Sequence, residues 1–223
     1  MSEIKDTSIS SFVEDLYIES IILKFIDSKL YPGICSQRPR WYHDSKNQDK
    51  GIDCDIFFKD LEAMSVDVKC AHDYVKTNVL KCSIPTFAFE LSYFKGREEK
   101  EGWLYDKSKE TAYYLLCWIW TKKEEDFKLD DILKLECCLI ERQKILYYLA
   151  TKNLYPEEAR EINRRIRASG KGGKHFVKDF PDIGLKKGLH FNYSKDIKAE
   201  GPINIIIFKD KFMHLATKHF FLY

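Results

Sequence analysis

The alternation of apolar and polar residues predicts a series of β-strands in the first half of the chain. Residues 51–58 and 65–70 are rich in β-branched and aromatic side chains and are separated by a short polar stretch, which is typical of a hairpin. A third strand is predicted at 86–91, where large apolar side chains alternate with small or charged ones. A longer apolar run at 112–120 predicts a fourth strand.

Helical spacing of apolar residues predicts helices in other parts of the chain. It indicates one helix at 8–29 and a long amphipathic helix at 129–152. A further helix begins with Pro156, which two acids follow, as expected at a helix N-terminus. A last strand is predicted at 203–208, before a tail at 213–223 that is either helical or extended.

Charged side chains gather on one face of the first predicted strands. Because side chains alternate across a strand, Asp53 and Asp55 share one face of the first strand, and Asp67 and Lys69 share one face of the second. Glu90 is expected to join the same face from the third strand. The alternative is a set of exposed ion pairs, each worth about 0–1 kcal/mol, or charges that protect a sheet edge from pairing.

The order of these residues resembles a known family of enzymes. The acid Asp53, the Asp-Val-Lys triplet at 67–69 and then Glu90 are similar to the motif of the PD-(D/E)XK nuclease superfamily, and the resemblance covers about residues 10–150. The sequence departs from that motif in two ways. Ile52 stands where a proline usually precedes the first acid, and the second acid is aspartate rather than the commoner glutamate.

The resemblance implies a fold and a division of the chain. The implied fold is restriction-endonuclease-like and of the α/β class, with a mixed central β-sheet flanked by helices. Residues 1–150 would form this core, and residues 151–223 would form a helical and basic C-terminal extension that packs on it in one compact domain. At 223 residues with 44% hydrophobic content, the chain is long enough to bury a sizeable core.

The resemblance also implies hydrolysis of DNA by a metal-activated water in an endonuclease, with RNA as the less expected substrate. Mg²⁺, or Mn²⁺ in its place, needs few protein oxygens because it keeps several waters. Asp53, Asp67 and the backbone carbonyl of Val68 are the expected ligands. Lys69 would orient the attacking water or stabilise charge on the phosphate, and Glu90 would be a further ligand or a water-positioning base. The alternative is an inactive nucleic-acid-binding or protein-interaction module on the same fold.

A further acid is expected from the first helix. Glu19 falls among the apolar residues that form the core-facing stripe of this helix, and a carboxylate there needs a partner. Members of the superfamily often lend a glutamate from this helix to the site, so Glu19 is the candidate metal ligand and Glu14 is the second choice. The alternative is a glutamate at the edge of the stripe that reaches water.

Positive charge is concentrated in the last third of the chain. Residues 160–198 carry four arginines and seven lysines against four acids. A predicted helix and the glycine-rich loop after it hold the residues that we expect to contact DNA phosphates, namely Arg164, Arg165, Arg167, Lys171 and Lys174. A solvated loop without a ligand is the alternative. Rings among these charges would either stack on unpaired bases or pack in the core: Phe176, Phe180, Phe191 and Tyr193.

Composition limits the remaining function classes. No apolar run reaches the roughly 18–20 residues that span a bilayer, and the first residues are polar, so we expect a cytoplasmic protein without a membrane partner. Seven cysteines without a Cys-x-x-Cys pair indicate reduced thiols and make a zinc site unattractive. A chain with one site would cut both DNA strands either as a homodimer or by two successive nicks.

Overall fold

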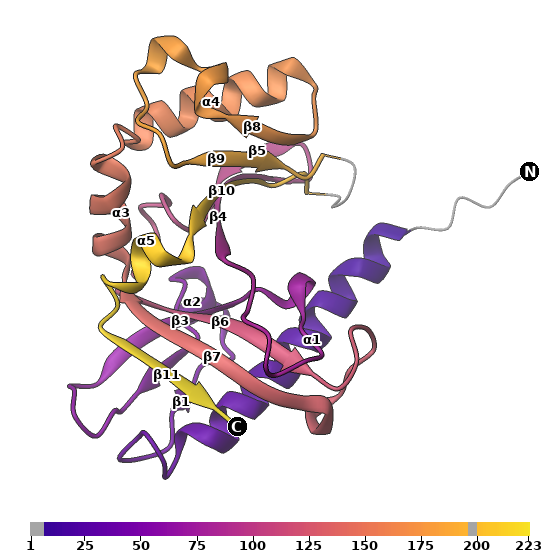
Figure 1. Cartoon of the computed structure of the whole chain (residues 1–223), viewed down its shortest axis with the longest axis vertical. Helices are drawn as coiled ribbons and strands as arrows, with labels where there is room; N and C mark the ends of the chain where they lie inside the picture. The colour runs from indigo at the N-terminus through magenta and orange to yellow at the C-terminus, as the bar shows by residue number, and fades with distance from the viewer. Residues whose placement is uncertain (1–6, 196–199) are drawn as a thin grey trace, which may run out of the picture.

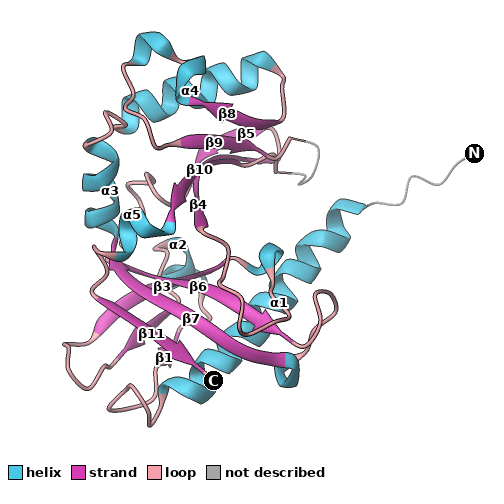
Figure 2. Cartoon of the chain, in the orientation of Figure 1, coloured by secondary structure: helices cyan, strands magenta, loops and turns pink. Residues whose placement is uncertain are grey.

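The computed structural model of the chain describes residues 7–195 and 200–223, with side chains from residue 17 onward. Within these residues the chain forms two β-sheets with several helices around them (Figures 1 and 2). One sheet has the strand order β1-β2-β3-β6-β7-β11, and the other has the order β5-β4-β10-β9-β8. The prediction of a mixed α/β protein is therefore confirmed at the level of class.

The six-stranded sheet is mixed. Its strands β3 and β6 run parallel, and all of its other neighbouring strands run antiparallel. Parallel neighbours need a long connection, and here that connection contains two strands of the other sheet. The strands of the six-stranded sheet are β1 (Arg40–Trp41), β2 (Cys54–Ile56), β3 (Met64–Cys70), β6 (Tyr113–Thr121), β7 (Ile132–Glu141) and β11 (Lys218–Leu222).

The five-stranded sheet is antiparallel throughout and combines strands from the middle and the end of the chain. Its central strand β10 lies between β4 and β9, so residues after position 150 are integral to the sheet. Its strands are β4 (Thr86–Lys95), β5 (Glu98–Glu101), β8 (Gly173–Phe176), β9 (His190–Tyr193) and β10 (Ile203–Phe208). The last strand β11 joins the other sheet, so the chain after residue 150 contributes to both sheets.

Helices cover these sheets. The α-helices are α1 (Thr7–Leu30), α2 (Ser45–Asp49), α3 (Arg142–Ala150), α4 (Pro156–Ser169) and α5 (Lys209–Met213). Short 3₁₀ turns are η1 (His72–Tyr74), η2 (Leu129–Asp131), η3 (Val177–Asp179) and η4 (Pro181–Ile183). As predicted, α4 begins at Pro156, and it ends before Gly170 in the left-handed conformation with φ of 65°. Among the described residues, no helix is long and apolar enough to cross a membrane.

Two hydrophobic cores lie on opposite faces of the six-stranded sheet. Along β6, Leu115 and Cys117 point into the core under α1, whereas Trp118 and Trp120 point into the core shared with the five-stranded sheet. Helix α1 crosses the sheet diagonally (Figure 1) and buries residues such as Ile26 completely. The seven cysteines are free thiols, as predicted.

One of the predicted elements differs in the structure, and the tail takes one of its two predicted forms. The helix predicted at 129–152 is wrong over its first half, because Ile132–Glu141 forms strand β7 and only Arg142–Ala150 is helical. This strand is buried on both faces over most of its length, so its apolar run shows no alternation that distinguishes it from a helix. The tail at 213–223 contains a strand, β11.

Candidate functional site

Asp67 and Lys69 form the centre of the candidate site. Both lie on β3 and point to the face opposite Val66 and Val68, which pack under α1. Lys69 Nζ lies 2.6 Å from Asp67 Oδ1, and the side chain of Asp67 is only 3% exposed while that of Lys69 is 31% exposed. The Lys69 side chain therefore lies between the buried Asp67 carboxylate and the solvent.

Asp53 reaches the same point from the neighbouring strand. It lies directly before β2, and its backbone N–H donates to the carbonyl of Val66 at 3.0 Å. Its carboxylate oxygen Oδ2 accepts a hydrogen bond of 2.7 Å from the backbone N–H of Val68. The Asp53 side chain thus continues the hydrogen bonding of β2 and β3 beyond the end of β2, where it meets Asp67.

The pKa values in this group reflect its burial and its mixed charges. Burial raises the pKa of Asp67 to about 7; the ammonium of Lys69 opposes this shift, and the negative charge of Asp53 adds to it. Burial by itself would lower the pKa of Lys69, but the charges of Asp67 and Asp53 raise it overall. Lys69 therefore stays protonated, whereas Asp67 gains and loses its proton near neutral pH.

Aromatic residues support the site, and sequence reasoning did not assign them to it. The Lys69 ammonium lies 5.7 Å from the centre of the Trp103 ring, which packs edge-on against Tyr114 at 4.7 Å. The hydroxyl of Tyr114 donates to the Trp103 carbonyl at 3.2 Å. Gly102 is required before this tryptophan, because a Cβ there would lie 2.3 Å from the Glu90 carbonyl oxygen. The Gly102-Trp103 pair is therefore the feature of the sequence that could have indicated this aromatic part of the site.

Arg142 fixes the loop that carries Trp103. Its guanidinium donates to the carbonyls of Leu104 at 3.0 Å, Asp106 at 2.7 Å and Lys109 at 2.9 Å. Because three of its nitrogens bind three separate carbonyls, the loop is tied to the start of α3 in one conformation.

Glu90 does not share the sheet face of Asp67, so this part of the prediction is wrong. It lies on β4, which belongs to the five-stranded sheet and pairs there with β10, with Asn204 opposite Glu90. Three strands that follow one another in sequence are not neighbours here, because β6 takes the place beside β3 that the prediction gave to β4.

Glu19 is exposed on α1, in contrast to the predicted core-facing position. Its negative charge nevertheless contributes to the raised pKa of Lys69, after the larger effects of burial, which acts in the opposite direction, and of Asp67 and Asp53. It is therefore within electrostatic range of the site. The side chain of the second choice, Glu14, lies outside the described residues.

The donor set fits a partly hydrated ion of the Mg²⁺ type. Two carboxylates, the buried Asp67 and the half-buried Asp53, lie side by side, and a divalent cation would relieve their mutual repulsion. The carbonyl of Val68 belongs to the residue whose N–H already binds Asp53. In the part of the chain that the structure describes, no group of three or more histidine, cysteine or acidic side chains is arranged to hold a metal.

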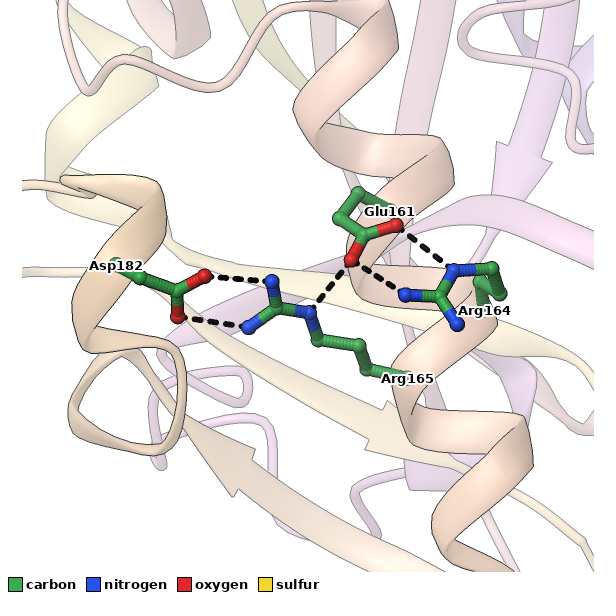
Figure 3. Close-up of polar contacts among 4 residues, drawn as sticks. All are labelled: Glu161, Arg164, Arg165 and Asp182. Atoms are coloured by element: carbon green, nitrogen blue, oxygen red, sulfur yellow. Dashed lines mark hydrogen bonds and ion pairs between the residues drawn. The ribbon is translucent and has the colours of Figure 1, made fainter.

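The arginines expected to bind DNA are engaged with acids of the chain. Arg165 binds both Glu161 and Asp182, and Arg164 binds Glu161 through two nitrogens (Figure 3). The side chain of Arg167 is only 11% exposed and binds Glu99 at 2.8 Å. The contacts with Asp182 and Glu99 connect α4 to other parts of the chain, and the predicted contact of these arginines with DNA stays a prediction.

Lys171 and Lys174, the two lysines of the predicted phosphate-binding loop, are exposed. The four rings predicted either to stack on bases or to pack divide clearly. Phe180, Phe191 and Tyr193 are buried, whereas Phe176 is 46% exposed. Comparison with protein families, with characterised proteins and with solved structures finds no match for the chain.

Proposed function

We propose that the chain is a metal-dependent nuclease that hydrolyses phosphodiester bonds in DNA. The observation that carries this proposal is the contact of two carboxylates, Asp53 directly before β2 and Asp67 on β3, beside the ammonium of Lys69. Their order along the chain, an acid followed by an acid-x-lysine triplet, is also the order in the PD-(D/E)XK resemblance and agrees with a restriction-endonuclease-like core.

Asp53 and Asp67 would hold the ion together with the backbone carbonyl of Val68. Such an ion supplies a water of lowered pKa and neutralises charge on the phosphate. Binding of a cation requires Asp67 to be deprotonated, so its pKa of about 7 predicts that metal binding strengthens as the pH rises toward 7.

Lys69 would act as a fixed positive charge in this mechanism. Because its pKa is raised, it keeps its proton and is unsuited to act as a base. Its ammonium, on a side chain that is 31% exposed, would instead stabilise negative charge that builds up on the phosphate oxygens in the transition state. The ring of Trp103 beside it restricts where this ammonium points.

A catalytically inactive DNA-binding or protein-interaction module is the second candidate. It is favoured by the direct ion pair between Lys69 and Asp67, which satisfies the buried carboxylate without any metal. The place of Glu90 on a strand of the other sheet agrees with this candidate, because Glu90 does not share the sheet face of Asp67.

Cleavage assays on plasmid, single-stranded and branched DNA, with Mg²⁺ or Mn²⁺ and then with EDTA, separate the two candidates. We expect cleavage that EDTA abolishes, and we expect Asp67→Asn and Lys69→Ala each to lower the rate by about 100-fold or more. The matched control is Asp55→Asn, whose carboxylate lies close by on β2 but binds Tyr42 and Ser65. Cleavage by both site variants at the wild-type rate would exclude this site, and absence of metal-dependent cleavage in the wild type would favour the inactive module.

A further inference from the structure

The outer face of the five-stranded sheet carries a row of exposed rings. Phe176 on β8 and Phe208 at the end of β10 are 46% and 43% exposed. The ring of His190 on β9 lies between them, 6.2 Å from Phe176 and 6.3 Å from Phe208, measured between ring centres. We call these three residues the ring platform.

The strand register places the platform on one face. His190 is directly opposite Phe176 on one side and Ile206 on the other, and directly paired residues share a face. Phe208 follows Ile206 by two positions and therefore points the same way. The platform is thus a consequence of strand pairing and does not depend on loop conformation.

The opposite face of the same sheet is buried. The residues one position along, Phe191 on β9 and Ile205 on β10, are fully buried in the core with Ile162 of α4. Helix α4 lies along this side of the sheet (Figure 1). The two faces therefore differ: one is packed, while the other presents large rings, including two phenylalanines, to solvent. Exposed apolar groups that cluster in this way mark interaction sites.

Positive and amide groups border the rings. Lys174 lies two positions before Phe176 on the same face of β8, which is an edge strand. Lys178 Nζ lies 5.8 Å from the centre of the Phe176 ring. In the row next to the rings, Asn192 is paired with both Lys174 and Asn204, and Glu90 follows Asn204 at the far end of the row from Lys174. Flat rings, amide groups and ammonium groups are therefore arranged side by side, with the ammonium groups at the sheet edge.

We propose that the ring platform binds single-stranded nucleic acid. Every base has a flat face that stacks on aromatic rings, and the phosphates between bases require positive charge nearby. Stacking would use Phe176, His190 and Phe208, the phosphates would follow Lys174 and Lys178, and the two asparagines would face base edges, for which an amide supplies both donors and acceptors. A duplex keeps its bases stacked on one another, so the platform selects single strands.

This inference concerns binding and does not rest on turnover at the Asp53 and Asp67 site. It also differs from the expected contact of the α4 arginines with phosphate, since none of the platform residues belongs to that helix. Failure of the cleavage assay would therefore leave it untouched.

The test is fluorescence anisotropy of labelled oligo-dT and oligo-U with the full chain in EDTA, so that no strand is cut. We expect Phe208→Leu and Phe176→Leu, which keep an apolar side chain but lose the ring, each to weaken binding by about 5-fold to 100-fold. Phe208→Trp should retain binding. The same variants should leave the weaker binding of a blunt duplex unchanged.

The matched control is Phe221→Leu. Phe221 is 39% exposed and has a histidine ring 5.2 Å away, but it lies on β11 in the other sheet. We expect this variant to bind like the wild type, and thermal melting should show all variants folded. Equal loss with Phe221→Leu, or wild-type affinity in both platform variants, would overturn the proposal. Preference between oligo-dT and oligo-U then tells DNA from RNA.

The lysines provide an independent measurement. Each phosphate contact to a single strand contributes a slope of about −0.7 to the logarithm of affinity against the logarithm of salt concentration. Lys174→Gln and Lys178→Gln should each make this slope less steep by up to about 0.7, whereas Lys46→Gln on helix α2, which is not part of the platform, should not change it. An unchanged slope in both platform variants would contradict the assigned path of the phosphates.

Discussion

At the scale of single residues, Asp67 has the least favourable surroundings for a charged group in the site. It is a carboxylate that is 2% exposed and has another carboxylate beside it, with one ammonium group as compensation. Burial therefore raises its pKa from 3.8 to about 7, so the folded state binds a proton that the unfolded state releases at lower pH. A group shifted in this direction gives stability below its unfolded pKa, and that stability is lost as the pH rises through the folded pKa.

This balance predicts a pH-dependent effect of Asp67→Asn. Between about pH 4 and pH 7 the wild type should lose stability that the amide variant keeps, because asparagine has no proton to lose. Relative to the wild type, the variant should gain unfolding free energy on the order of a few kcal/mol across this window, and little more above it. Urea unfolding at several pH values without added metal measures the difference. A constant difference from pH 4 to pH 7 would contradict the assigned pKa.

At the scale of elements, the site depends on a strand and on a loop that is fixed from elsewhere. Strand β3 aligns Asp67 and Lys69, and the loop after β5 brings Trp103 over the lysine. Arg142, at the first position of α3, binds three carbonyls of that loop. Arg142 at the start of α3 therefore determines the surroundings of the Lys69 ammonium on β3.

We accordingly expect Arg142→Lys to be a damaging substitution despite its conserved charge. A lysine ammonium is a single point of contact and cannot satisfy three separate carbonyls. The free energy of unfolding should fall by about 1.5–3 kcal/mol, measured by urea denaturation. Lys144→Ala on the same helix removes an exposed ion pair with Glu141 and should stay within about 0.5 kcal/mol of the wild type. Similar losses of unfolding free energy in both variants would mean that the three hydrogen bonds of Arg142 contribute no more to stability than an exposed ion pair.

Sequence patterns predicted the elements of this site better than their neighbours. Two-residue periodicity placed Asp67 and Lys69 on one face of a strand, which the structure bears out. Periodicity carries no information on which strands pair, so it could not show that β4, with Glu90, leaves for another sheet. It also failed for β7, where burial of both faces removes the alternation. The partners of Arg142 are backbone carbonyls, and because every residue has one, the residue types in the sequence cannot indicate this contact.

At the scale of the whole molecule, a buried ion pair ties the two sheets together. Lys209 follows β10 of the five-stranded sheet at the start of α5, and its ammonium binds the carboxylate of Glu136 on β7. The side chains are 17% and 8% exposed, respectively. The hydroxyl of Ser83 and a ring nitrogen of His219 also contact this carboxylate, at 3.0 and 2.9 Å.

Removal of one partner of this pair should therefore be costly. Lys209→Met leaves the Glu136 carboxylate buried without its cation and should lower the free energy of unfolding by about 3–5 kcal/mol. The double variant Lys209→Met with Glu136→Leu should recover most of that loss, since no buried charge remains. The control is Lys211→Met, because the Lys211 pair with Asp210 is exposed. A Lys209→Met variant as stable as that control would show that the pair does not hold the sheets together.

The position of β10 and β11 in the two sheets has a consequence for synthesis of the protein. β10 lies between β4 and β9, and β11 pairs with the outer edge of β7, so neither sheet is complete until residues 203–222 have been synthesised. Until then the nascent polypeptide holds the long strands β4 and β7 with unpaired edges, which are templates for aggregation. A chain whose translation stops before residue 203 would thus be an aggregation-prone fragment rather than a smaller folded protein.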